Sequence, residues 1–137
     1  MKKLSYIISK SKRAFSQEFT QTILKKVAYT ISLYEQTTDI IARSDYNQFT
    51  LILSRSTTDQ LFKDVDIIRQ SISEIKLSTP DKIVVNVTVT GGFVTKPKNA
   101  PLEESIKRAK ELLNSGRHIG ANRIFRLKDL PKDLQKI

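Results

Sequence analysis

The sequence contains no cysteine, and His118 is its only histidine. Without cysteine the chain offers neither a disulfide nor a thiolate, a usage that fits a cytoplasmic protein. The usual ligands of a zinc cluster are therefore missing. A Ser-His-Asp catalytic arrangement would have to use His118, which lies in a basic turn with no nucleophile elbow nearby. We interpret His118 as a solvated loop residue.

Long hydrophobic runs are also absent. No stretch approaches the length of a membrane span, and the amino terminus lacks the apolar core of a signal peptide. The 137 residues are 39% hydrophobic and 28% charged, which is typical of a folded globular chain. We expect one domain over residues 1–128 and a frayed polar tail over residues 129–137.

Positive charge dominates, with 24 Lys and Arg residues against 14 Asp and Glu residues and a formal net charge of +10. This balance favours polyanionic partners, although solubility alone explains it equally well. Basic residues are dense toward the carboxyl end, where phosphates could bind. They are Lys107, Arg108, Lys110, Arg117, Arg123 and Arg126. Stacking residues beside them are sparse and no RNA-binding signature appears, so we favour a solvated basic face and keep a nucleic-acid-binding module as an alternative.

Three segments carry apolar residues at the spacing of amphipathic helices. The first begins at Ser16, a candidate amino-terminal cap. The second covers residues 61–75 and ends before a turn at residues 79–81. The third begins at Pro101 and ends near Gly116, which we expect to cap it. The apolar positions are Phe19, Ile23, Val27, Ile31, Tyr34, Leu61, Val65, Ile68, Ile72, Ile75, Leu102, Ile106, Ala109 and Leu113.

Strand-like runs surround these helices. They occur at residues 4–9, in a hairpin over residues 39–53, at residues 85–90 and at residues 123–127. The pair Gly91-Gly92 indicates a bulge or a close backbone approach. The order β-α-β-β-α-β-α-β favours an α/β (α+β) fold, with a mainly antiparallel sheet and helices packed on it.

The hairpin also resembles a family signature. Residues 42–49 read Ala-Arg-Ser-Asp-Tyr-Asn-Gln-Phe. In diguanylate cyclases, the GGDEF domains, a strand ending in Ala-Arg leads through an aromatic residue to Gly-Gly-Asp/Glu-Glu-Phe. Residues 87–94 are similar to that family's Val-Thr-Val-Ser-Ile-Gly-Val-Ala strand, and residues 109–124 align without gaps on its closing Ala-Asp-x-Ala-Leu-Tyr-x-Ala-Lys-x-x-Gly-Arg-Asn-x-Val run.

The resemblance implies a palm-like sheet, of the ferredoxin-like or nucleotide cyclase-like kind. Complete members open with a helical segment ending in Asp-x-Leu-Thr-x-Leu-x-Asn-Arg, and nothing like it precedes Leu4. We therefore expect an amino-terminally shortened domain, either trimmed from a longer chain or shortened in nature.

Catalysis in this family joins two GTP molecules with divalent metal, held by an Asp of the first strand and by the acidic pair of the hairpin tip. Here the first Asp of the chain is Asp39. The tip reads Asp45, Tyr46, Asn47, Gln48 and Phe49, so the acidic pair is replaced by two amides. Amide oxygens are weak Mg²⁺ ligands and cannot neutralise the metal. We expect a degenerate domain with no catalytic residue, no metal site and no cofactor.

Some nucleotide-binding character is retained on the same resemblance. Asp39 occupies the Asp position of the family's Arg-x-x-Asp product site, but its Arg position holds Gln36. Arg69 lies near a second family arginine, although we favour its interpretation as a surface arginine beside an apolar stripe. Arg117 and Asn122 occupy the Lys and Asn positions of the closing run. These four residues, Asp39, Arg69, Arg117 and Asn122, are the candidate nucleotide-binding residues.

Three hypotheses follow. In the first, the domain is a catalytically inactive scaffold in bacterial signalling that binds a protein partner or associates with itself. In the second, it senses cyclic di-GMP or GTP without turnover. In the third, the net charge of +10 serves nucleic-acid binding.

Overall fold

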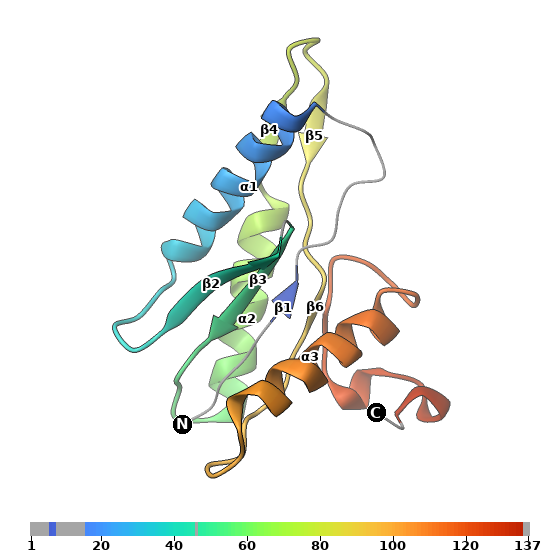
Figure 1. Cartoon of the computed structure of the whole chain (residues 1–137). Coiled ribbons are helices and arrows are strands. Elements are labelled where there is room, and N and C mark those ends of the chain that lie inside the picture. Colours follow the sequence, from blue (N-terminus) through green and yellow to red (C-terminus); the bar gives the residue numbers. More distant parts are fainter. Residues whose placement is uncertain (1–5, 8–15, 46, 136–137) are drawn as a thin grey trace.

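The computed structural model of the chain describes residues 6–7, 16–45 and 47–135. Within these residues the elements follow the order β1-α1-β2-β3-α2-β4-β5-β6-α3-β7 and end in two 3-10 turns (Figure 1). The alternation of helices and strands read from the sequence is recovered. The differences lie in the segment between α2 and α3, at the end of α3 and at the carboxyl end, and of the strand expected over residues 4–9 all but residues 6–7 lie outside the described residues.

A three-stranded antiparallel sheet carries the predicted hairpin. β2 (Ile40–Asp45) pairs with β3 (Gln48–Ile52), and β1 (Tyr6–Ile7) pairs with the other side of β3, giving the order β1-β3-β2. The register of β2 against β3 shifts between Arg43 and Asp45, next to the hairpin tip. β2 is therefore an edge strand among the described elements, and β3 lies at the centre.

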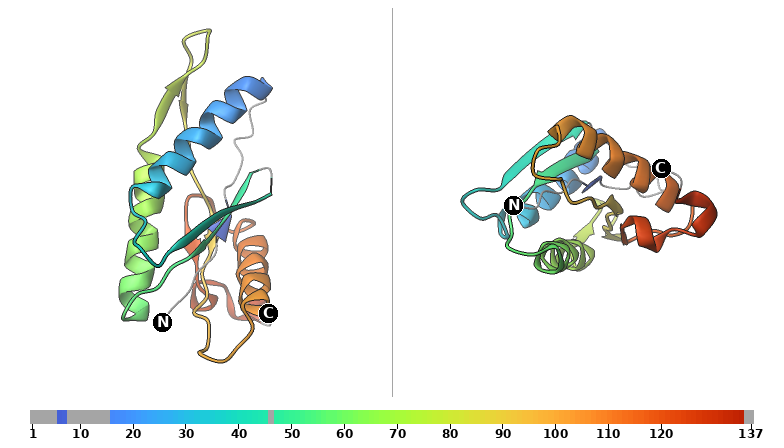
Figure 2. Two further views of the ribbon diagram at one scale, coloured as in Figure 1. Left: turned by 60° about the vertical axis from the view of Figure 1, so that its left-hand side comes forward. Right: turned by 90° about the horizontal axis from the view of Figure 1, so that it is seen from below.

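Two helices cover the apolar side of β3 and pack on each other, α1 (Gln17–Ser32) and α2 (Thr58–Ser73) (Figures 1 and 2). The predicted cap of α1 is confirmed, because Oγ of Ser16 accepts a hydrogen bond from the backbone N–H of Phe19 at 3.1 Å. Thr57 caps α2 in the same way. The predicted apolar stripes supply much of the core, including Val27, Ile31, Leu61, Val65, Ile68 and Ile72.

The third helix, α3 (Leu102–Gly116), packs on β1, on β6 (Gly91–Gly92) and on β7 (Ile124–Phe125), and β6 and β7 pair in parallel. A Cβ atom added at Gly92 would lie 1.9 Å from the carbonyl oxygen of Ala109, a residue of α3. Of the two interpretations of Gly91-Gly92, the close backbone approach is therefore the one that the structure confirms.

The expectation that Gly116 caps α3 is wrong. Gly116 is the last residue of the helix, and Arg117 takes the cap position with an ordinary right-handed backbone. A Cβ atom at position 116 would lie 2.3 Å from Cδ2 of Phe125. Glycine is needed there to make room for a buried ring rather than to adopt a left-handed conformation.

Between α2 and β6 the chain forms an arm that the sequence did not indicate. β4 (Lys76–Ser78) and β5 (Val84–Asn86) pair antiparallel as a separate hairpin, which projects beyond the helices in Figures 1 and 2. The predicted turn at residues 79–81 lies at its tip. The single long strand expected over residues 85–90 is wrong, because the strand stops at Asn86 and pairing resumes only near β6.

The segment after β7 is ordered around a buried leucine. Two 3-10 turns cover Leu127–Asp129 and Lys132–Leu134. Leu130 lies between them and packs with Leu112 and Phe125 in a second, smaller apolar cluster. The expected fraying is therefore wrong for residues 129–135.

The mixed arrangement of helices and small, mainly antiparallel sheets confirms the predicted fold class. In the described part of the chain, no helix combines the length and apolar character needed to cross a bilayer.

Candidate functional site

The hairpin tip joins β2 to β3 and was the first candidate site. Asp45 lies opposite Gln48, just beyond the shift in register between Arg43 and Asp45. Asn47 and Gln48 are half-buried, whereas Phe49 is buried in the main core. Tyr46 lies outside the described residues. The polar part of the tip thus combines one carboxylate with two amides, and its aromatic end anchors the hairpin to the domain.

The carboxylate of Asp39, at the opposite end of β2, is fully engaged by the protein. Its Oδ1 accepts from Nη1 of Arg55 at 2.8 Å and from the backbone N–H of Ser54 at 3.2 Å. Its Oδ2 accepts from Nη2 of Arg55 at 3.0 Å and from the backbone N–H of Gln36 at 2.8 Å. The side chain has no exposed surface. In this arrangement Asp39 holds the ends of β2 and β3 together and presents no free oxygen to a ligand.

Arg55 is shared between two acids. Besides Asp39, its Nε donates to Oδ2 of Asp64, on α2, at 2.6 Å. Burial by itself would raise the pKa of Asp39, but the hydrogen bonds from Arg55, Gln36 and Ser54 outweigh it and lower that pKa below its usual value. The hydrogen bond to Asp39 chiefly raises the pKa of Arg55. The pair is therefore charged at neutral pH.

Two of the predicted binding residues meet at the start of β7. Nη1 of Arg69, on α2, donates to the side-chain oxygen of Asn122 at 3.0 Å and to its carbonyl oxygen at 3.2 Å. Nε of Arg69 donates to Asp66 at 2.6 Å, and this hydrogen bond is the main reason why the pKa of Asp66 is lowered. Asn122 has a left-handed backbone (φ 56°), and its N–H donates to Oγ1 of Thr90 at 3.1 Å.

Arg117, the remaining candidate, follows α3 and is exposed. Among the described residues, neither Arg117 nor Asp39 hydrogen-bonds to Arg69 or Asn122. The structure therefore brings together one pair of the four candidates, and it places Asp39 in a network of its own.

Within residues 6–7, 16–45 and 47–135, no group of three or more His, Asp or Glu side chains is close enough to hold an ion. Asp45 stands at the tip with amide neighbours, and the carboxylate of Asp39 is occupied by Arg55.

Arg55 and Asp64 are the residues that the sequence reasoning missed. Arg55 follows the apolar run of β3 after a single serine, and Asp64 lies two turns into α2. An arginine directly after a buried strand is only weak evidence for a buried ion pair, because most arginines are exposed to solvent. The partner 16 positions away, Asp39, becomes evident only once the hairpin is folded.

Comparisons with solved structures agree with this fold. The chain matches the GGDEF domain of DgcB from Caulobacter crescentus in complex with c-di-GMP (TM-score 0.74, 20% identity), covering 80% of this chain and 66% of that one. It matches the active GGEEF domain of a diguanylate cyclase from Vibrio cholerae (TM-score 0.77, 16% identity), covering 91% and 81%. For diguanylate cyclase SiaD in complex with its activator SiaC from Pseudomonas aeruginosa, the TM-score is 0.70, the identity 15% and the coverage 77% and 40%.

The chain thus spans just under two thirds of the DgcB domain and less than half of SiaD. At these identities the likeness establishes the fold. Among curated proteins, none matches the sequence. A family model described as "Diguanylate cyclase, GGDEF domain" matches residues 10–123, which is most of the chain. This match confirms the resemblance carried by the hairpin and the closing run, and the chain belongs to the GGDEF domain family.

Proposed function

We propose that this GGDEF domain is catalytically inactive and acts in bacterial signalling, in the cytoplasm, as a scaffold that binds a protein partner or a second copy of itself. The observation that carries the proposal is the chemistry of the hairpin tip. Asn47 and Gln48 occupy the positions where the family resemblance places the acidic pair, and Asp45 is the carboxylate beside them. Mg²⁺ binds hard, charged oxygens, which two amides do not supply.

The state of Asp39 supports the same proposal. A carboxylate with both oxygens engaged by Arg55 and by backbone N–H groups is structural rather than metal-binding. Removing it from this network to serve a ligand would leave the buried guanidinium of Arg55 with only Asp64 as an acidic partner.

Catalytic inactivity is tested by incubating the purified chain with GTP and Mg²⁺ or Mn²⁺ and following cyclic di-GMP by chromatography. We expect no product beyond that of a no-protein blank, while a competent GGDEF cyclase run in parallel forms it. Because the chain spans only part of some relatives, the assay is repeated on the protein expressed from its full reading frame. Product that rises linearly with protein concentration would refute the proposal.

A protein partner is supported by the projecting β4–β5 arm. Ile83 and Val84, next to the turn of the arm, are 45% and 60% exposed and form an adjacent apolar pair on a hairpin that projects beyond the helices (Figure 1). SiaD, which shares the fold, is described in complex with its activator SiaC. We expect this arm to contribute to the contact between the domain and its partner.

The partner contact is tested by affinity capture from native lysate with the wild-type chain and with an Ile83→Ser/Val84→Ser variant, identified by mass spectrometry. Light scattering of both proteins measures self-association in parallel. A Lys76→Ser/Lys82→Ser variant, which changes polar residues of the same arm, is the matched control. If neither a specific protein nor a dimer depends on Ile83 and Val84, the arm is not the docking surface. If the wild-type chain captures nothing and stays monomeric, the scaffold role itself fails.

Nucleotide sensing without turnover is a second candidate, favoured by the contact between Arg69 and Asn122, which is close in sequence to the exposed Arg117 that follows α3. The DgcB domain is described in complex with c-di-GMP. Calorimetric titration of the chain with cyclic di-GMP and with GTP tests this role, using Arg69→Gln and Arg117→Gln as variants. Absence of heat at high micromolar ligand removes the candidate. Asp39→Ala is unsuitable as a control because it breaks a buried ion pair.

A further inference from the structure

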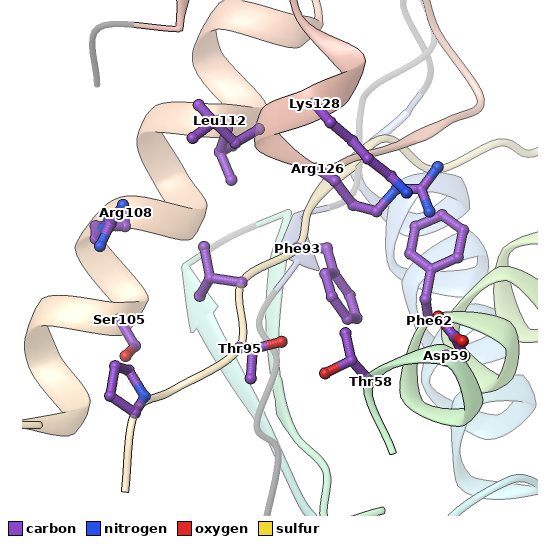
Figure 3. A pocket seen from close by; sticks show the side chains of 13 residues that line it. Thr58, Asp59, Phe62, Phe93, Thr95, Ser105, Arg108, Leu112, Arg126 and Lys128 are labelled. Carbon is purple, nitrogen blue, oxygen red and sulfur yellow. The ribbon is translucent and has the colours of Figure 1, made fainter. Parts of the chain in front are cut away.

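A cavity of about 410 Å³ lies away from the hairpin tip, at the end of the domain where β3 leads into α2. Its walls come from the start of α2, the segment after β6, α3 and the segment after β7 (Figure 3). Its volume is in the range of small-molecule sites. None of Asp39, Arg69, Arg117 and Asn122, the candidates carried over from the family resemblance, lines it.

The floor of this cavity is aromatic. The rings of Phe62 and Phe93 meet edge to face with their centroids 5.2 Å apart. The guanidinium of Arg126 lies over the ring of Phe62 at 3.9 Å and is paired with Asp129. Phe93 is only 4% exposed and the guanidinium covers the ring of Phe62, so the planar surface open to an aromatic ligand is the guanidinium itself, with the edge of Phe62 beside it.

The rim is basic. Arg108 on α3 and Lys128 after β7 both line the cavity, and neither side chain has a hydrogen bond or ion pair with another described residue. Arg126 is already neutralised by Asp129, so Arg108 and Lys128 are the cations left for a ligand. In Figure 3 Arg108 lies on α3 at one side of the cavity, whereas the side chain of Lys128 lies beside Arg126 and Phe62 at the other side. Asp59, the acidic lining residue, lies across the cavity from Arg108 in Figure 3, so the anionic group is expected on the side of α3.

A buried hydroxyl faces the same space. Ser105 lines the cavity from α3 and is only 7% exposed. Within the part of the chain that the structure describes, its side chain has no hydrogen-bond partner. Buried hydroxyl groups are normally paired, and an unpaired one beside a cavity indicates that a ligand or water completes it.

We propose that this cavity binds a phosphate monoester with a flat aromatic base, the chemistry of a nucleoside monophosphate. The base stacks on the guanidinium of Arg126 and against the edge of Phe62, where an amino group of the base can donate to Asp59. The phosphate is held by Arg108 on the side of α3, with Ser105 as a hydrogen-bonding partner, and Lys128 lies on the side of the base (Figure 3). This inference does not depend on whether the hairpin tip is catalytic, because it uses other residues at another end of the sheet.

The test is isothermal titration calorimetry of the whole chain with adenosine 5′-monophosphate, adenosine and inorganic phosphate. We expect the monophosphate to bind at least about tenfold more tightly than either part alone, since aromatic and charged contacts both contribute. Arg108→Gln/Lys128→Gln should weaken its binding by about tenfold or more. Lys107→Gln/Lys110→Gln, which removes the same charge from exposed positions of α3 outside the lining, should leave binding nearly unchanged, as should Arg69→Gln.

Several results would overturn the proposal. These are no heat with millimolar adenosine monophosphate, equal affinity for inorganic phosphate, or equal losses in the two double variants. The last result would assign binding to the general positive charge of α3. Circular dichroism of each variant tests whether it is folded. The four residues replaced in the two double variants are all exposed, so their substitution is compatible with a native fold.

Discussion

The guanidinium of Arg55 donates two hydrogen bonds to the carboxylate of Asp39, and the two side chains are 5% and 0% exposed. The pair joins residues that flank the β2–β3 hairpin, and Asp64 extends it onto α2. A buried pair of this kind adds little net stability by itself, because desolvation offsets the attraction. Losing one member is costly, since the other is left charged in a dry environment.

Replacing Arg55 by methionine should therefore lower the free energy of unfolding by about 3–5 kcal/mol. The double variant Asp39→Asn/Arg55→Met should recover part of that loss, because an amide at position 39 carries no charge and its single carbonyl oxygen can still accept from Gln36 or from Ser54. Urea denaturation followed by circular dichroism measures both. Arg117→Met, at an exposed position, is the control and should change stability by less than about 0.5 kcal/mol. Equal effects of the two arginine substitutions would contradict the structural role of Arg55.

The same carboxylates predict how stability depends on pH. The pKa values of Asp39, Asp66 and Asp129 are all lowered from an ordinary value of 3.8. An unfolded chain binds protons at these groups before the folded one does, so their stabilisation is complete above pH 3.8 and is lost as pH falls through the lowered folded values. We expect the free energy of unfolding to be flat from about pH 7 to 5 and to decline below about pH 4.

Urea unfolding at a series of pH values between 2 and 7 provides the measurement. Asp39→Asn should flatten part of the acid decline, since it removes one of the three groups. Asp81→Asn, in the exposed arm turn, is the matched control and should leave the shape of the curve unchanged. A decline that begins well above pH 5 would show that some other group dominates.

Gly92 is predicted to be irreplaceable even by alanine. The added Cβ would lie 1.9 Å from the carbonyl oxygen of Ala109, a backbone atom that moves only if α3 shifts away from β6. Overpacking of this kind typically costs about 1–3 kcal/mol or more. Gly120→Ala is the control, because a Cβ there finds its nearest neighbour at 3.5 Å, on the flexible side chain of Arg123. In thermal unfolding, Gly92→Ala should have a clearly lower midpoint than Gly120→Ala. Equal stability of the two variants would show that α3 does not approach β6 so closely.

The sequence predicted the elements whose residues repeat with a clear period. Ser16 with the stripe that follows it, and the alternation around Phe49, each indicate one element and one buried face. The arm was missed because β4 is three residues long and follows α2 after only two residues. The strand expected over residues 85–90 failed for a different reason. Val85, Val87 and Val89 are all buried, so the alternation was real, but alternation reports burial and not hydrogen-bonded pairing.

The sequence predicted the candidate site only where single residues differ from the family signature. The amides at positions 47 and 48 are visible in the sequence and need no structure. The contact of Arg69 with Asn122 joins residues 53 positions apart, and that of Arg55 with Asp39 joins residues 16 apart. Which charged residues meet is decided by how α2 lies against β7 and the hairpin. The cavity beside Phe62 and Phe93 was likewise invisible, because its lining comes from four separate segments.

Restoring acids at the hairpin tip should separate metal binding from catalysis. In the variant Asn47→Asp/Gln48→Glu, two carboxylates join Asp45 at the tip, where they can bind a hard cation that the wild-type amides hold weakly. We expect this variant to bind Mn²⁺ at least about tenfold more tightly than the wild-type chain, since charged ligands bind a divalent ion far better than neutral ones. The affinity is measured by titrating Mn²⁺ into the protein and following the paramagnetic broadening of NMR signals from residues near position 48, such as Thr50.

The same variant should still fail to form cyclic di-GMP from GTP. Asp45 stands where the family resemblance places a glycine, so a side chain would remain in the space that the guanine needs. Asp39, moreover, stays bound to Arg55. Asn47→Ala/Gln48→Ala is the matched control for changes in loop conformation and should bind Mn²⁺ no better than the wild-type chain. If the wild-type chain binds Mn²⁺ at the tip as tightly as the acidic variant, amide substitution is not what disables this hairpin.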